Sequence, residues 1–309
     1  MIDICCKFLI VGKKAINAIL FIVLCFIWGS SFILMKLGMF DENQQVALSP
    51  YHVAALRMFS SGFVMLPFLF NAIKNLPKET IKYVLLSGCV GSFIPAFLFC
   101  IAETKVDGAV AGSLNSLTPL FVIITGVIFF KIDTTKQKII GVVVGLLGCV
   151  LLTLAKADEI KSVGDIGYSG FIILATVLYG INVNMVYKRL QGVSSMQIAT
   201  VAFTGLIIPA LLVLWITGYF QLPLSDKKYL ISSVASSVLG IINTTVASVL
   251  FYMLIKRAGG LLASLVTYGV PLIAIGWGIY YGEKINFLQV TSLLIILFGV
   301  YIAYRQKKS

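Results

Sequence analysis

The feature that most constrains the fold is a hydrophobic run of membrane-spanning length that carries a proline and occurs twice. The first copy is AVAGSLNSLTPLFVIITGVIFFK, residues 109–131, and the second is LLASLVTYGVPLIAIGWGIYYGE, residues 261–283. An offset of 152 residues, without gaps, places Pro119 opposite Pro271. Each run has the roughly 20 apolar residues that a helix needs to cross a bilayer. The chain is therefore interpreted as an internal duplication of a membrane-spanning unit.

Further matches extend the duplication along the chain. The offset of 152 also pairs Phe99 with Phe251, and an offset of 151 pairs Trp28 with Tyr179. Because lipid offers the backbone no hydrogen-bond partner, spanning runs of this kind must be helices. We therefore predict an all-α integral membrane protein with ten transmembrane helices in two five-helix repeats. The predicted spans are 15–37, 52–72, 81–102, 107–130, 138–155, 167–188, 196–218, 229–254, 259–281 and 287–304.

Composition excludes a soluble protein and a nucleic-acid-binding protein. Hydrophobic residues make up 59% of the 309 residues, charged residues only 12%, and the mean hydropathy is +1.01, so a soluble surface is not available. The net charge of +12 would fit nucleic acid, but the basic residues lie in short clusters between apolar runs and not along one face. The predicted partner is the lipid bilayer.

The distribution of basic residues predicts the orientation. With the N-terminus inside, sixteen Lys and Arg fall on the inner side and seven on the outer side, as the positive-inside rule requires. We expect a multi-pass protein of the cytoplasmic (inner) membrane with both termini in the cytoplasm. Residues 1–14 form a cytoplasmic segment, 15–155 the first repeat and 165–305 the second. Because five spans is an odd number, the repeats are inverted, which is typical of transporters with a site near the midplane.

Short motifs at these positions resemble a known family. WGSSF at residues 28–32 and ALR at residues 55–57 are similar to signatures of the EamA family of the drug/metabolite transporter superfamily. The Ala-x-Ala pattern before Pro119 and the stretch from Pro271 to Glu283 resemble its two repeat cores. The resemblance implies ten helices in two inverted halves that move small metabolites by alternating access. The chain departs from the pattern at Lys131, where the second copy has an acid.

The two prolines predict a polar cavity in the membrane. A proline inside a helix frees the carbonyl four residues earlier, and in hydrocarbon that carbonyl needs a partner or water. Each proline lies on a helix face with polar side chains at helical spacing. A cavity between the two helices is one interpretation, and hydrogen bonding between helices is the other. The candidate residues are Asn115, Thr118 and Pro119 in the first copy, and Ser264, Thr267, Tyr268 and Pro271 in the second.

Other spans carry candidate cavity residues too. Trp28 and Ser31 lie in the first predicted span, Tyr179 and Asn182 in the sixth, and Asn243 in the eighth. An aromatic ring with a polar edge is suited to cover an amphipathic solute, although Trp28 is equally well interpreted as a packing residue.

Arg57 is the most specific single candidate for a functional residue, because it is a charged residue inside a predicted span. A charge near the centre of a span costs ~2.5–3.5 kcal/mol on insertion scales, so such a residue faces protein or water and has a partner. The functional interpretation is contact with an anionic solute, or a gate. The alternatives are a structural tie or snorkelling toward the interface. Glu103 and Glu283, at predicted outer helix ends, are candidates for proton coupling or are simply solvated.

The sequence shows no pattern typical of an enzyme. It has one histidine and no metal-binding or phosphate-binding motif, so we predict no catalytic residues, no metal and no cofactor. The predicted function is a secondary transporter of small organic metabolites or drugs that works by alternating access. The alternative is a membrane-embedded enzyme or a lipid-handling protein.

Overall fold

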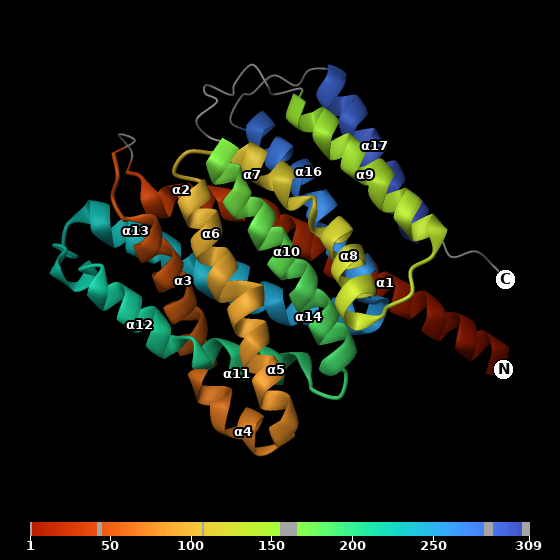
Figure 1. Cartoon of the computed structure of the whole chain (residues 1–309), viewed down its shortest axis with the longest axis horizontal. Coiled ribbons are helices and arrows are strands. Elements are labelled where there is room, and N and C mark those ends of the chain that lie inside the picture. The colour runs from red at the N-terminus through yellow and green to blue at the C-terminus, as the bar shows by residue number, and fades with distance from the viewer. Residues whose placement is uncertain (1, 42–44, 107, 155–165, 281–286, 305–309) are drawn as a thin grey trace.

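The computed structural model describes residues 2–41, 45–106, 108–154, 166–280 and 287–304. Within these ranges the regular structure is helical, apart from one isolated antiparallel bridge between Phe40 and Val46. Figure 1 shows the helices packed side by side in an elongated bundle. The predicted repeat boundaries at 155, 165 and 305, and the predicted role of Glu283, lie outside the described residues.

The first half of the chain supplies eleven helical segments within the described ranges, and one of them, η2, is a π-helical segment inside the third predicted span. They are α1 (Ile2–Gly29), α2 (Ser31–Met39), α3 (Pro50–Met65), η1 (Leu66–Phe68), α4 (Leu69–Lys74), α5 (Lys78–Gly88), η2 (Cys89–Phe93), α6 (Ile94–Ala102), α7 (Gly108–Asn115), α8 (Thr118–Phe130) and α9 (Lys136–Leu154), where η1 is a short 3₁₀ turn.

The second half follows a similar order, with a longer π-helical segment, η6, inside the eighth predicted span. Its described segments are α10 (Ile166–Arg189), α11 (Ser195–Gly205), α12 (Ile207–Ile216), η5 (Tyr219–Gln221), α13 (Lys227–Val238), η6 (Leu239–Val246), α14 (Ala247–Ala258), α15 (Gly260–Ser264), α16 (Val266–Tyr280) and α17 (Phe287–Tyr304).

The outer surface of the bundle fits a membrane. Large apolar side chains are widely exposed, among them Phe70 at 78%, Trp215 at 72% and Ile216 at 78%, and lipid is the environment that accepts such a surface. All ten predicted runs contain helix, and six helical stretches are long and apolar enough to cross a membrane. These are Ala15–Met39, Pro50–Lys74, Lys78–Ala102, Gly167–Arg189, Ser195–Ile216 and Lys227–Ala258. The chain is thus an all-helical membrane protein.

The two proline-bearing runs are broken helices. The first is divided between α7 and α8 at Ser116 and Leu117, and the second between α15 and α16 at Leu265. Pro119 lies in the first turn of α8, where a missing N–H costs little. Pro271 lies inside α16. The two prolines therefore occupy different positions in their helices, although the sequence aligns them.

The π-helical segments occupy corresponding positions in the two halves. Cys89, where η2 begins, lies 150 residues before Leu239, where η6 begins. Each segment widens a helix that faces the interior, and π-bulges are frequent at functional sites. Their recurrence supports the duplication that the prolines indicated.

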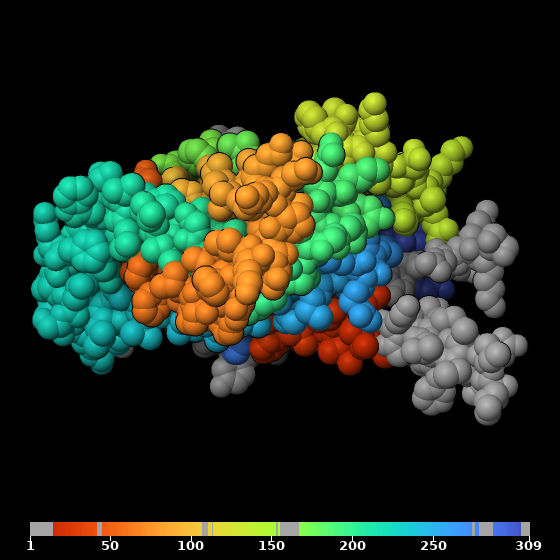
Figure 2. Space-filling model, turned by 90° about the horizontal axis from the view of Figure 1, so that it is seen from below, coloured from red at the N-terminus to blue at the C-terminus, as the bar shows by residue number. Residues whose placement is uncertain are grey.

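The two halves pack closely against each other. Gly299 of α17 lies so near α9 that a Cβ atom placed there would be 2.4 Å from the Gly145 nitrogen, a close approach that small residues permit. Figure 1 shows α9 and α17 side by side at one end of the bundle. Elsewhere the first-half segment α4–α5, orange in Figure 2, packs against α11 of the second half.

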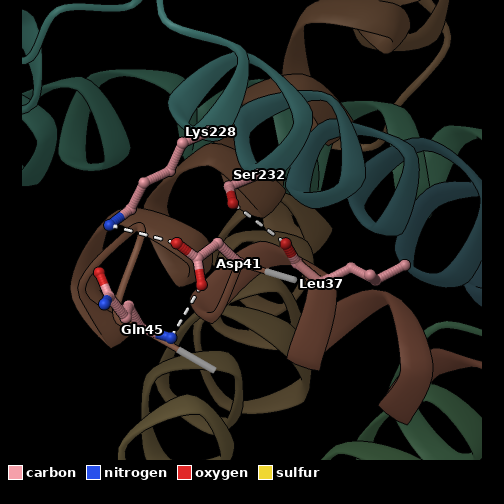
Figure 3. Close-up of polar contacts among 5 residues, drawn as sticks. All are labelled: Leu37, Asp41, Gln45, Lys228 and Ser232. Carbon is pink, nitrogen blue, oxygen red and sulfur yellow. Dashed lines mark hydrogen bonds and ion pairs between the residues drawn. The ribbon is translucent and has the colours of Figure 1, made fainter. Parts of the chain in front are cut away.

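A polar cluster joins the halves at one end of the bundle (Figure 3). The Asp41 carboxylate lies 3.6 Å from the Lys228 ammonium and accepts a 2.8 Å hydrogen bond from the Gln45 backbone N–H. The Ser232 hydroxyl donates to the Leu37 carbonyl at 3.1 Å. The loop after α2 is thereby held on the first turns of α13.

Candidate solute cavity

A cavity of about 100 Å³ lies at the centre of the bundle, between the two halves. Its volume is enough for several water molecules. The wall is formed by α1, α2, α3, η2, α6, α7 and α8 from the first half, and by α10, η6, α14 and α16 from the second. Both π-helical segments and both broken helices contribute to it. The interface between the repeats is therefore hollow where the helices are irregular.

Nine of the thirteen predicted site residues line this cavity. They come from seven different helical elements besides α3, so only the tertiary fold brings them together. The nine are Trp28, Ser31, Arg57, Asn115, Thr118, Tyr179, Asn182, Asn243 and Thr267.

The other four predicted residues do not line the cavity. Tyr268 is fully buried and donates a 2.7 Å hydrogen bond to the Val142 carbonyl of α9, on the far side of its helix. Ser264 donates to the Leu261 carbonyl one turn earlier at 2.7 Å. Pro119 and Pro271 are buried in helix packing. The predicted stripe assumed one unbroken helix, and the break at Leu265 puts its members on different faces.

Hydroxyl groups satisfy the two carbonyls that the prolines leave free. The Thr118 hydroxyl donates to the Asn115 carbonyl at 2.7 Å. The Ser116 hydroxyl donates to the Thr267 carbonyl across the two halves at 3.4 Å, a long contact. Both predicted interpretations therefore have support, since the stripes make hydrogen bonds within and between helices and also line the cavity.

Two aromatic pairs form matching parts of the wall. The Trp28 and Phe251 rings meet edge to face with centroids 4.9 Å apart, and the Phe99 and Tyr179 rings stack at 6.1 Å. The repeat offsets relate Trp28 to Tyr179 and Phe99 to Phe251, so each pair joins both halves. Phe99 and Phe251 were not among the predicted site residues. Their pairing at the offset of 152 was the signal in the sequence that identified them as equivalent.

Amide side chains provide the neutral polar part of the wall. The Asn182 carbonyl oxygen accepts a 2.6 Å hydrogen bond from the Ser87 hydroxyl. The Asn243 side-chain amide donates to the Ile27 carbonyl, and the backbone carbonyl of Asn243 accepts from the Trp28 indole at 3.1 Å. Gly91 makes room for Asn182, because a Cβ atom there would lie 2.1 Å from the Asn182 amide nitrogen. Gly91 was not predicted, since a glycine carries no polar signal.

Arg57 is the one charged side chain in the described wall of the cavity. Its Nε atom donates to the Thr244 hydroxyl at 2.5 Å, and Thr244 is its hydrogen-bond partner among the described residues. A guanidinium has five N–H donors, so four remain for water or a solute. Arg57 is thus tied to η6 and remains half-buried at the cavity, which argues against snorkelling.

The described residues contain no group of three or more His, Cys, Asp or Glu side chains placed to hold a metal ion. The cavity as described offers one cation, amides, hydroxyls and aromatic rings. Groups of these kinds are suited to bind and orient a small solute.

Comparison with known proteins connects this architecture to a family. The profile of the EamA-like transporter family matches residues 15–154 and, a second time, residues 167–305. An uncharacterized transporter from Archaeoglobus fulgidus is 24% identical over 290 residues, covering 91% of this chain and 95% of the relative. Protein PagO from Salmonella typhimurium is 23% identical, covering 94% and 93%.

Other relatives and a solved structure agree. The uncharacterized inner membrane transporter YedA of Escherichia coli is 23% identical, covering 89% of this chain and 86% of that protein. A crystal structure with 16% sequence identity has the same fold, with a TM-score of 0.71 over 95% of this chain and 99% of the other. Since the family profile covers both repeats, the chain belongs to the EamA-like transporter family.

Proposed function

We propose that the chain is a secondary transporter that carries a small organic solute across the cytoplasmic membrane by alternating access. In this proposal ten helices span the membrane in two inverted halves, both termini face the cytoplasm, and the cavity lies near the midplane. The observation that supports it most directly is the cavity itself, which is enclosed by equivalent elements of both repeats.

The wall favours a solute with an apolar or aromatic body and a negatively charged group. The rings of Trp28, Phe99, Tyr179 and Phe251 present flat apolar surface, which covers such a body well. Arg57 is the only charge in the described wall and keeps unused N–H donors. A guanidinium in this setting binds a carboxylate or phosphate through paired, charge-assisted hydrogen bonds.

The irregular helices supply the means of movement. Broken helices and π-helical segments have fewer regular backbone hydrogen bonds, so their bends change at lower cost than those of a continuous helix. In this chain they occur in both halves and meet at the cavity. Rocking of one half against the other would therefore open the cavity to each side in turn.

Uptake into proteoliposomes tests this function. A thermal-shift screen of the purified chain against aromatic carboxylates, amino acids, nucleosides and organic cations first selects the solutes to be labelled. Benzoate, phenylacetate and phenyl phosphate are then compared with the neutral benzamide and the cationic benzylamine. We expect saturable uptake of an anionic member, with counterflow against the unlabelled solute.

The matched control is Tyr268→Phe, because that side chain faces α9 and not the cavity. This variant should transport like the wild type. Uptake of the selected solutes no faster than into empty liposomes, or conversion of a solute without its transfer, would contradict the proposal and favour an enzyme.

A further inference from the structure

Glu103 is a buried acid without a hydrogen-bond partner. It directly follows α6 and is 7% exposed. Among the described residues neither of its carboxylate oxygens has a hydrogen-bond partner, and it is the one acidic side chain described there as buried. An ionised carboxylate in such a place is strongly unfavourable unless it is paired. The side chain is therefore expected to hold a proton in this conformation.

Glu103 is one helical turn from the solute cavity. Its backbone N–H donates to the Phe99 carbonyl at 2.9 Å, and residues four apart lie on one face of a helix. Phe99 is part of the cavity wall and stacks on Tyr179. The neighbouring Cys100 thiol lies 3.5 Å from the sulfur of Met35, a second wall residue. A small movement of α6 would thus connect the carboxyl with the cavity.

The fold does not need an acid at this position. The offset that pairs Phe99 with Phe251 places Glu103 opposite Ile255, which is fully buried in the second half. An apolar side chain therefore satisfies the packing at the equivalent site. The acid in the first half carries a desolvation cost that packing alone does not explain.

Burial and two nearby cations together determine the pKa of the Glu103 carboxyl. Burial raises the pKa of the Glu103 carboxyl to about 8, while the positive charges of Lys36 on α2 and Arg57 on α3 hold it below what burial alone would give. The Cys100 thiol on its own helix is also within electrostatic range. At pH 7 the acid is mostly neutral, and it lies close enough to ionisation to respond to its surroundings.

A bound anionic solute would raise the pKa of the Glu103 carboxyl. An anion held by Arg57 neutralises one of the two cations that favour the ionised carboxylate. By thermodynamic linkage, a solute that favours proton binding is itself bound more tightly when the proton is present. Proton and anionic solute then occupy the chain together and leave it together.

We infer that Glu103 carries one proton per anionic solute, so that the chain couples solute movement to a proton gradient as a symporter. The proton moves from water on one side to a Glu103 carboxylate oxygen, and from there to water on the other side once the cavity opens. No other bond is made or broken. This inference rests on the proposed transport function and specifies its driving force.

The protonated acid can be observed without any solute. Infrared spectra of the wild type in bilayers should contain the carbonyl stretch of a neutral carboxylic acid at pH 7, lost as the pH rises through about 8. Glu103→Gln should lack this band, and Glu79→Gln, which changes an exposed acid of α5, should keep it. Persistence of the band in Glu103→Gln, or its absence from the wild type, overturns the inference.

Transport assays give the second test. With benzoate, phenylacetate or phenyl phosphate, whichever the wild type carries, an acidic outside should drive accumulation, and Glu103→Gln should exchange the solute but not accumulate it. Above the pKa the apparent affinity of the wild type should fall by up to about tenfold per pH unit. Glu103→Asp, which keeps an acid, should retain accumulation.

The outcomes separate the two proposals. Unchanged proton-driven accumulation in Glu103→Gln, or wild-type uptake with no proton movement, overturns the symport inference and leaves the transporter standing. If Glu103→Gln does not fold, the wild-type infrared titration and the proton movement still decide. A wild type that carries no solute overturns both proposals.

Discussion

The two halves share a backbone plan but differ in the charges that they bring to the cavity. Gly88 of the first half packs on the Ala202 carbonyl, and Gly240 of the second packs on the Arg57 carbonyl. Because Gly88 and Gly240 are 152 residues apart, Arg57 and Ala202 are structural equivalents. Glu103 is likewise opposite Ile255.

The comparison separates the residues that the packing requires from those that the proposed transport function would use. In the second half these two positions are occupied by buried apolar residues, and the same packing forms. Apolar side chains thus satisfy the packing at both positions in the second half, so packing alone does not call for the charges of the first half.

The largest effect is expected from making the first half like the second at Arg57. In Arg57→Ala, solute transport should fall strongly while expression and folding are kept, because Ala202 occupies the equivalent site. A hydrogen bond to a charged group is worth about 1.5–3 kcal/mol, so initial uptake should fall by about tenfold or more. Uptake into proteoliposomes and thermal unfolding measure the two effects.

Arg57→Lys is the matched control, since it keeps the positive charge but loses the planar guanidinium with its paired N–H donors. It should bind the solute more weakly than the wild type and better than Arg57→Ala. Transport by Arg57→Ala at the wild-type rate would remove Arg57 from the solute site and leave it as a structural tie to Thr244.

A second test uses the equivalent glycines, and its effect falls on stability. A Cβ atom at Gly240 would lie 2.3 Å from the Arg57 carbonyl oxygen, whereas one at Gly88 would lie 3.1 Å from that of Ala202. Gly240→Ala should therefore lower the free energy of unfolding by about 1–3 kcal/mol, as overpacking does. Gly88→Ala should cost less. Thermal unfolding in detergent measures both losses. Equal losses would show that the two halves accommodate an added methyl group at these positions equally well.

Much of this architecture could be predicted from the sequence because the membrane imposes strong patterns. Apolar runs indicated the helical segments, and the repeat offset indicated which of them are equivalent. Polar side chains in apolar runs are costly unless they are buried, which is why Trp28, Arg57 and Asn243 could be placed at the cavity. These inferences needed only composition and spacing.

The rest depends on local backbone geometry that the sequence pattern does not contain. Helical spacing assumed that Ser264 and Tyr268 lie on one straight face, and the break at Leu265 separates them. The π-helical segments were not predicted, and Gly91, which lies in one of them, was not placed at the cavity. The offset between equivalent residues of the two halves also varies along the chain, since the loops differ in length. The equivalent N-cap residues Ser49 and Ser194 are only 145 residues apart, compared with 152 for the two prolines.

The smallest effect is expected at the two prolines, which align in the sequence but occupy different positions in their helices. Pro119→Ala changes a first-turn residue of α8, where an N–H finds no helical partner, so turnover should stay near that of the wild type. Pro271→Ala restores a donor inside α16 that competes with the Ser116 hydroxyl, 3.4 Å away, for the Thr267 carbonyl. The straighter helix should draw Thr267 from the cavity wall and slow turnover, with the amount of folded protein unchanged in size-exclusion chromatography.

If both variants slow turnover alike, the two prolines have the same effect on transport, as their alignment in the sequence suggests, in spite of their different positions in the helices. If neither variant slows turnover, the bends are packing features, and the movement between the halves arises elsewhere in the bundle, with η2 and η6 as the next candidates.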